Sequence, residues 1–98
     1  MKIPKEITVG RKKYTVRFVN KLHNPPSIGR VYYDQKVIQI AKQDCHGTPL
    51  EAEEVDDTFW HELTHCILDD MGHPLCSDER FVTAFANRLS NAVNSAKL

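Results

Sequence analysis

The sequence has no long apolar run, no signal-peptide pattern and no net charge. Its apolar stretches all fall short of the about 18 residues that a membrane-spanning helix needs. The opening stretch, MKIPKEITVG, has neither the apolar segment nor the small-residue cleavage site of a secreted protein. Thirteen basic residues balance thirteen acidic ones, which gives no overall attraction to nucleic acid or to anionic lipid. We therefore expect a cytoplasmic protein whose partners include neither membrane nor nucleic acid.

Cysteine is also scarce, and its spacing argues against a disulfide framework. The three cysteines, Cys45, Cys66 and Cys76, are an odd number and include no CxxC pair. Reduced thiols are the state expected of such a set. We expect Cys66 in the core and Cys76 as a free thiol in a connection between two helices, from which it could approach a nearby metal site.

The length of 98 residues limits the size of any site. We expect one domain, residues 1–98, with a single modest core and no deep cleft between two lobes. A functional site must then be open to solvent or completed by a partner. Basic residues crowd the first fifth of the chain, whereas residues 51–57 are acidic. Both runs are interpreted mainly as solvated surface, with docking to a partner as the alternative.

Alternation of apolar and polar residues over the first forty positions predicts two hairpins. Turn signals at residues 10–12 and 34–35 separate the strands, and residues 24–27, with two prolines, form a loop. A small antiparallel sheet of three or four strands is expected. The apolar residues of its strands are Ile7, Val9, Tyr14, Val16, Phe18, Val31, Tyr33, Ile38 and Ile40.

The rest of the chain is predicted to form two packed helices, which gives an α+β fold. Thr48 as N-cap and Gly72 as a left-handed stop place the first helix from about Pro49 to Met71. Ser77 is expected to cap the second helix, which runs to about Asn94. The predicted core stripes are Val55, Phe59, Trp60, Leu63 and Ile67 on the first helix, and Phe81, Val82, Phe85, Ala86, Leu89 and Val93 on the second.

The first helix carries the most informative pattern of the chain, the segment HELTH at residues 61–65. His61 and His65 lie one helical turn apart, so both can offer a ring nitrogen to one zinc ion at about 2.0 to 2.1 Å. Glu62 projects about 100° from His61 on the helix, where it suits a general base acting on a water rather than a ligand. A solvated helical face and a structural zinc site are the less favoured interpretations, because neither needs Glu62.

A catalytic zinc takes three protein ligands, so a third one is needed downstream. The histidine of the extended metzincin pattern is missing, since Met71 stands at its position. Glu79 is our choice, because two antiparallel helices joined by a short connection return its side chain to the motif face. The alternatives that remain open are Asp78, Asp69 and His73, with Asp69 also suited to orienting an imidazole.

These two helical motifs resemble the small gluzincin-type metallopeptidases of the ImmA/IrrE family. The segment HELTH is similar to the HELGH of that family, with Thr64 in place of its usual glycine. Residues 79–86, ERFVTAFA, resemble the downstream helix in which a ligand glutamate precedes a Phe-Ala pair by six residues. The hairpin at residues 29–40 is also similar to one that such proteins carry before the motif helix.

The resemblance implies a minimal zincin-like fold, with Zn²⁺ held by His61, His65 and Glu79 and with Glu62 as the base. The sequence also resembles phage-encoded zincins of this small size. The implied activity is zinc-dependent hydrolysis of a peptide bond in a protein or peptide substrate, with the oligomeric state left open. The alternative is a zincin-fold binding protein that docks on a host protein without hydrolysis. Candidate donors to the oxyanion, among which the sequence does not choose, are His23, Arg30, Tyr32, Tyr33, His46, His73 and Arg80.

Overall fold

The structure, a computed structural model, describes residues 3–22 and 27–97 and has the expected α+β class. Strands β1 (Glu6–Val9), β2 (Lys12–Val19), β3 (Gly29–Tyr32) and β4 (Val37–Ala41) precede helix α1 (Ala52–Asp70). A 3-10 turn, η1 (Pro74–Ser77), then leads to helix α2 (Glu79–Ser95). Most of the loop predicted at residues 24–27, and His23 before it, lie outside the described residues.

The four strands form one sheet in the order β1-β2-β4-β3, and one of its pairings differs from the expected pattern. The β1/β2 and β3/β4 pairs are antiparallel hairpins, as predicted, whereas β2 and β4 run parallel. The sheet is therefore mixed rather than wholly antiparallel. Strand β4 is nearly all apolar and buried, which suits an interior position. The more exposed β3 is left at the edge, beside α1.

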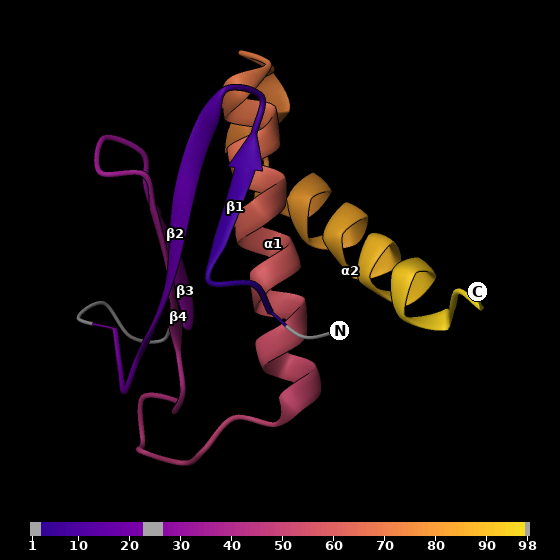
Figure 1. Ribbon diagram of the computed structural model, residues 1–98. Coiled ribbons are helices and arrows are strands. Elements are labelled where there is room, and N and C mark those ends of the chain that lie inside the picture. Colours follow the sequence, from indigo (N-terminus) through magenta and orange to yellow (C-terminus); the bar gives the residue numbers. More distant parts are fainter. Residues whose placement is uncertain (1–2, 23–26, 98) are drawn as a thin grey trace.

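Helix α1 lies along one face of the sheet, and α2 packs against α1 from the other side (Figure 1). Within the described part of the chain, α2 contacts α1 and η1 but none of the strands. Cys66 and Trp60 are buried in the core, as predicted. The main buried apolar cluster consists of Val9, Tyr14, Val16, Ile38, Ile40, Phe59, Trp60, Leu63, Cys66 and Ala86.

Five residues expected to face the core are partly exposed. On α2, Phe85 is 45% and Val93 41% exposed, because within the described chain this helix packs only on its α1 side, and Tyr33, after the end of β3, is 38% exposed. Ile67 is 37% exposed, because the buried stripe on α1 advances from Leu63 by three residues to Cys66 rather than by four. Phe18, near the end of β2, is 44% exposed. None of the helices in the described part of the chain has the length and apolar character that crossing a membrane requires.

The helix ends differ from the prediction by a few residues. Thr48 does not cap α1, because the helix begins further along the chain; Thr48 belongs to a preceding turn, where its backbone N–H donates to Oδ1 of Asp44 at 2.9 Å. Helix α1 instead begins after Glu51, whose N–H donates to Oε1 of Glu54 at 3.3 Å. The stop at Gly72 is confirmed by its positive φ of 65°.

The cap of α2 is Asp78 rather than Ser77. Its Oδ1 accepts a hydrogen bond from the N–H of Phe81 at 3.0 Å, while Ser77 ends the η1 turn. The shift by one residue makes Glu79 the first residue of α2, directly after the cap.

Candidate metal centre

Helix α1 holds the two histidines of the motif in fixed positions. On its sheet side, Phe59, Leu63 and Cys66 are at most 6% exposed, so the rotation of the helix about its axis is set by core packing. His61 and His65 project from the opposite side of this packing, with their ring centroids 5.0 Å apart. Their side chains are 23% and 11% exposed, so both rings are reachable but mostly enclosed.

Glu79 reaches the same point from α2. Its Oε2 lies 3.0 Å from Nε2 of His61, and its Oε1 lies 2.8 Å from Nε2 of His65. Among the described residues, these three side chains form the group whose donor atoms all lie within 4.8 Å of one another. The carboxylate of Glu79 is 68% exposed, so the group opens toward solvent. Such a group could hold a metal ion.

The alternative third ligands have other contacts. Asp69 lies 3.7 Å from Nζ of Lys12, an ion pair that joins α1 to the first hairpin. His73 accepts a hydrogen bond at its Nδ1 from the N–H of Leu75 at 3.1 Å. Asp78 caps α2. The structure thus brings Glu79, and not these three, to the pair of imidazoles.

His65 is oriented by a backbone group that the sequence could not reveal. Its Nδ1 donates to the carbonyl of Cys76 at 2.9 Å, and this hydrogen bond directs Nε2 toward Glu79. The thiol of Cys76 lies 3.4 Å from the carbonyl of His65 and belongs to this support rather than to the donor group. Every residue has a backbone carbonyl, so the sequence does not show which one accepts this hydrogen bond. The shortness of the connection between the two helices was the one indication that a group from it would lie near His65.

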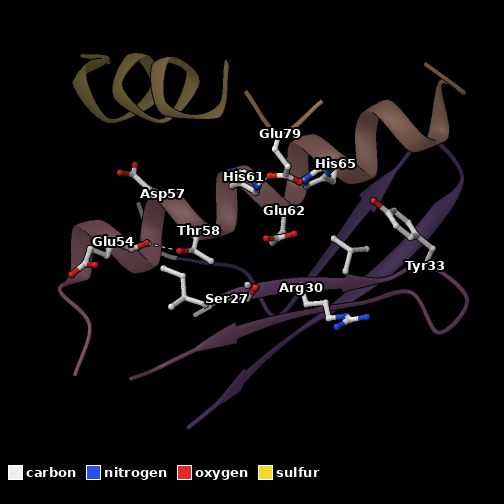
Figure 2. A pocket seen from close by; sticks show the side chains of 13 residues that line it. Ser27, Arg30, Tyr33, Glu54, Asp57, Thr58, His61, Glu62, His65 and Glu79 are labelled. Carbon is white, nitrogen blue, oxygen red and sulfur yellow. Dashed lines mark hydrogen bonds and ion pairs between the residues drawn. The ribbon is translucent and has the colours of Figure 1, made fainter. Parts of the chain in front are cut away.

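Glu62 is buried and has no polar partner among residues 3–22 and 27–97. It is 8% exposed, and its carboxylate points into the space below the histidines (Figure 2). Burial, and secondly the negative charge of Glu79, raise the pKa of Glu62 to about 7. Burial also lowers the pKa of His61, which favours the neutral imidazole that binds metals. A carboxyl group that changes protonation near neutral pH is suited to moving protons.

A cavity of about 640 Å³ lies between α1 and the edge strand β3, and it includes the three donor residues and Glu62. Gly29 of β3 makes this close approach possible. A Cβ atom at this position would lie 2.5 Å from Cγ2 of Thr58 and 2.7 Å from Oε2 of Glu62. Sequence reasoning missed this role of Gly29, because the clash is with residues about thirty positions away.

Two of the candidate oxyanion donors line this cavity. Tyr33 does so with its hydroxyl 3.7 Å from Sγ of Cys76, beside His65 (Figure 2). Burial and the hydrogen bond to Cys76 raise the pKa of Tyr33, so its hydroxyl stays protonated and able to donate. Arg30 also lines the cavity, but its guanidinium lies 5.3 Å from the centre of the Tyr32 ring. His46, His73 and Arg80 do not line it.

The donor set could hold a tetrahedrally coordinated divalent metal ion. Ligand atoms at about 2.0 to 2.2 Å from one tetrahedral ion stand roughly 3.3 Å apart. The observed nitrogen-to-oxygen distances of 2.8 and 3.0 Å need only a small outward adjustment to reach this value. Comparison of the chain with protein-family models, with curated proteins and with solved structures finds no match. Function must therefore be inferred from the chemistry of this site.

Proposed function

We propose that this protein is a zinc-dependent metallopeptidase of the gluzincin kind, as its resemblance to the ImmA/IrrE family implies. The observation that carries the proposal is the contact of Glu79, from a separate helix, with both imidazoles of the HELTH segment. Two imidazoles and one carboxylate are the protein ligands typical of a catalytic zinc. Other divalent ions accept the same ligands, and zinc is preferred because three donors suit a tetrahedral ion with one open position.

A zinc ion in this position would act as a Lewis acid and supply an acidified water for attack on the peptide carbonyl. Glu62 then accepts the proton of the attacking water and passes it to the leaving nitrogen. Its burial and its freedom from polar partners in the described chain support this role. The Tyr33 hydroxyl donates a hydrogen bond to the oxygen on which negative charge develops.

The edge of β3 offers the peptide a place to bind. The carbonyl of Ile28 accepts the N–H of Ala41 at 2.8 Å, so Ile28 points its polar groups toward β4. Alternation along the antiparallel pair directs those of Gly29 and Val31 away from β4. Both residues line the cavity. An extended peptide can therefore add to this edge as a further strand beside the metal centre.

A docking protein that keeps the fold without hydrolysis is the second candidate. Large apolar side chains that are well exposed favour it, namely Met71 at 64%, Phe85 at 45% and Phe18 at 44%. Such side chains occur singly on many surfaces, whereas the buried Glu62 carboxylate would have no use in a docking protein. We therefore prefer the enzyme.

Two measurements on untagged protein test the proposal. Metal content by mass spectrometry should give about one zinc per chain in the parent and little in His61→Ala or Glu79→Ala. A library of peptides incubated with zinc-loaded protein should then be cleaved by the parent and about a thousandfold more slowly by Glu62→Gln, which keeps its zinc. Glu53→Gln, an exposed carboxylate outside the cavity, is the matched control and should cleave like the parent.

The outcomes separate the two candidates. A parent that takes up no zinc even when it is offered in excess excludes the metallopeptidase. Zinc uptake that depends on His61 and Glu79, together with no cleavage of any peptide, supports the docking protein instead.

A further inference from the structure

The cavity beside the metal centre extends toward the first turns of α1, where its wall is acidic. Glu54 and Asp57 line it together with His61 and Glu62. Figure 2 shows Glu54 and Asp57 on the turns of α1 that precede His61, with Asp57 pointing away from Glu62. We propose that this end of the cavity binds the lysine or arginine side chain of a peptide substrate, on the C-terminal side of the cleaved bond. The inference rests on the proposed peptidase function and adds the class of substrate to it.

The charge of this wall is not neutralised within the described chain. Neither Glu54 nor Asp57 forms an ion pair with a described residue, since the carboxylates of the ion pairs in this part of the chain are those of Glu6, Asp69, Asp70 and Glu79. One oxygen of Glu54 is used weakly, since Oε1 accepts the N–H of Glu51 at 3.3 Å. Asp56, another acidic residue near this turn, faces α2 and accepts hydrogen bonds from Ser90 and Asn94. Two carboxylates are thus left beside the cavity for a cationic ligand.

Arg30, the basic side chain on the opposite wall, does not serve these carboxylates. Side chains alternate along β3, so that Gly29 and Val31 face α1 whereas Arg30 and Tyr32 point to the other face of the sheet. The guanidinium of Arg30 is accordingly placed over the ring of Tyr32, away from α1 (Figure 2). A cation that meets Glu54 and Asp57 must therefore come with the ligand.

A second observation indicates that this cavity receives a polar ligand. Glu62, next to the acidic wall, is more than nine-tenths buried, points into the cavity, and has no hydrogen bond or ion pair among the described residues. A buried carboxylate without a partner is unfavourable unless a bound group satisfies it. The acidic wall is therefore part of a cavity that also contains a buried carboxylate suited to a polar ligand, and not simply an acidic stretch of exposed helix.

The direction of β3 determines which end of a bound peptide meets the acidic wall. The strand begins at Gly29, next to Thr58 and Glu62, and its chain continues to Tyr33, next to Cys76 and His65. Strand and helix thus run in the same direction. A peptide that pairs antiparallel with β3, the more stable pairing, runs the opposite way. Its residues after the cleaved bond lie toward Glu54 and Asp57.

The spacing along the helix limits the position of the basic residue. Asp57 precedes His61 by four residues and Glu54 precedes it by seven, which is about 6 and 10 Å along the helix axis. An extended peptide advances about 3.3 Å per residue. The lysine or arginine is therefore expected within the first three residues after the cleaved bond.

The test compares blocked peptides that carry either lysine or norleucine, its uncharged analogue, at each of these three positions. Zinc-loaded parent should cleave the best lysine peptide with a kcat/KM about tenfold higher than its norleucine partner, and added salt should reduce the difference. The double variant Glu54→Gln/Asp57→Asn should lose this preference. Glu53→Gln, on the same helix but outside the cavity, should retain it.

Binding of the same peptides to zinc-loaded Glu62→Gln, followed by fluorescence polarisation, separates this inference from the peptidase proposal. Tighter binding of the lysine peptide that depends on Glu54 and Asp57 supports the basic subsite even if no peptide is ever cleaved. Equal binding of the two peptides, or a lysine preference that survives in the double variant, overturns it.

Discussion

Both helices contribute to the candidate metal centre, α1 with His61 and His65 and α2 with Glu79, but the fold holds the two helices very differently. Helix α1 lies between the sheet and α2, and nine of its residues are buried. Of the other elements in the described residues, helix α2 contacts only α1 and η1, and its buried residues are Val82, Ala86 and Ser90. The difference indicates that His61 and His65 are preorganised by the core, whereas the position of Glu79 depends on one helix interface.

The unequal support matches the roles proposed for the three residues. A base and two ligands must keep their relative positions through a reaction, and one rigid helix carries His61, Glu62 and His65 together. The third ligand sits at the exposed start of α2, where it leaves room for water and substrate. A bound cation would then join the loosely held helix to the rigid one.

The largest expected effect is on stability, and it tests whether core packing stabilises α1 more than α2. Phe59→Ala on α1 removes a fully buried ring and should lower the free energy of unfolding by about 3 to 5 kcal/mol. Phe85→Ala on α2 removes a ring that is 45% exposed and should cost about 1 kcal/mol or less. Urea unfolding of the metal-free variants measures both values. Similar losses would contradict the comparison.

A second effect concerns the buried carboxylate of α1. The pKa of Glu62, about 7 in the folded protein, lies above its ordinary value of 4.5. The folded state therefore binds this proton more tightly than the unfolded state, and stability is lost as the pH rises from about 4.5 to 7. Metal-free Glu62→Gln should be more stable than the parent by on the order of 3 kcal/mol at pH 8.

The higher stability expected of metal-free Glu62→Gln should depend on pH, and this dependence identifies the charge of Glu62 as its cause. The gain should vanish near pH 4, where both states of the parent carry a protonated Glu62. The control is Glu53→Gln, an exposed carboxylate of the same helix, which should show no gain of this size. Urea unfolding between pH 4 and 8, with a chelator present, compares the three proteins. A difference between Glu62→Gln and the parent that does not change with pH would show that the Glu62 charge is not the cause.

The difference between the helices also explains which parts of the fold could be predicted. The strands, the two helices and the stop at Gly72 follow from local patterns of apolar residues and turn signals. The parallel pairing of β2 and β4 does not follow from local patterns. It depends on which strand of each hairpin is placed in the interior of the sheet, and this is decided by packing between the two hairpins. The caps at Glu51 and Asp78 were missed by one or a few residues, since several adjacent side chains are chemically able to cap.

The same holds for the site: the features set by local sequence could be predicted, and those set by the packing of distant segments could not. The motif on α1 predicted that His61 and His65 share one face, because that spacing is a property of any helix. The approach of Glu79 was inferred from the short connection and is present in the structure. The Cys76 carbonyl that orients His65 and the close approach at Gly29 had no local signal, since both arise where distant segments pack.

The last prediction concerns the bridge between the helices. Zinc at a hundred times its dissociation constant should raise the free energy of unfolding of the parent by about 2.7 kcal/mol, and that of Glu79→Ala much less. Hydrogen exchange should locate the effect. Without zinc, amides of α2 should exchange faster than those around Phe59, and zinc should slow α2 the most. If zinc slows both helices alike in Glu79→Ala, the ion is bound elsewhere, because only a ligand on α2 can transmit binding at His61 and His65 to that helix.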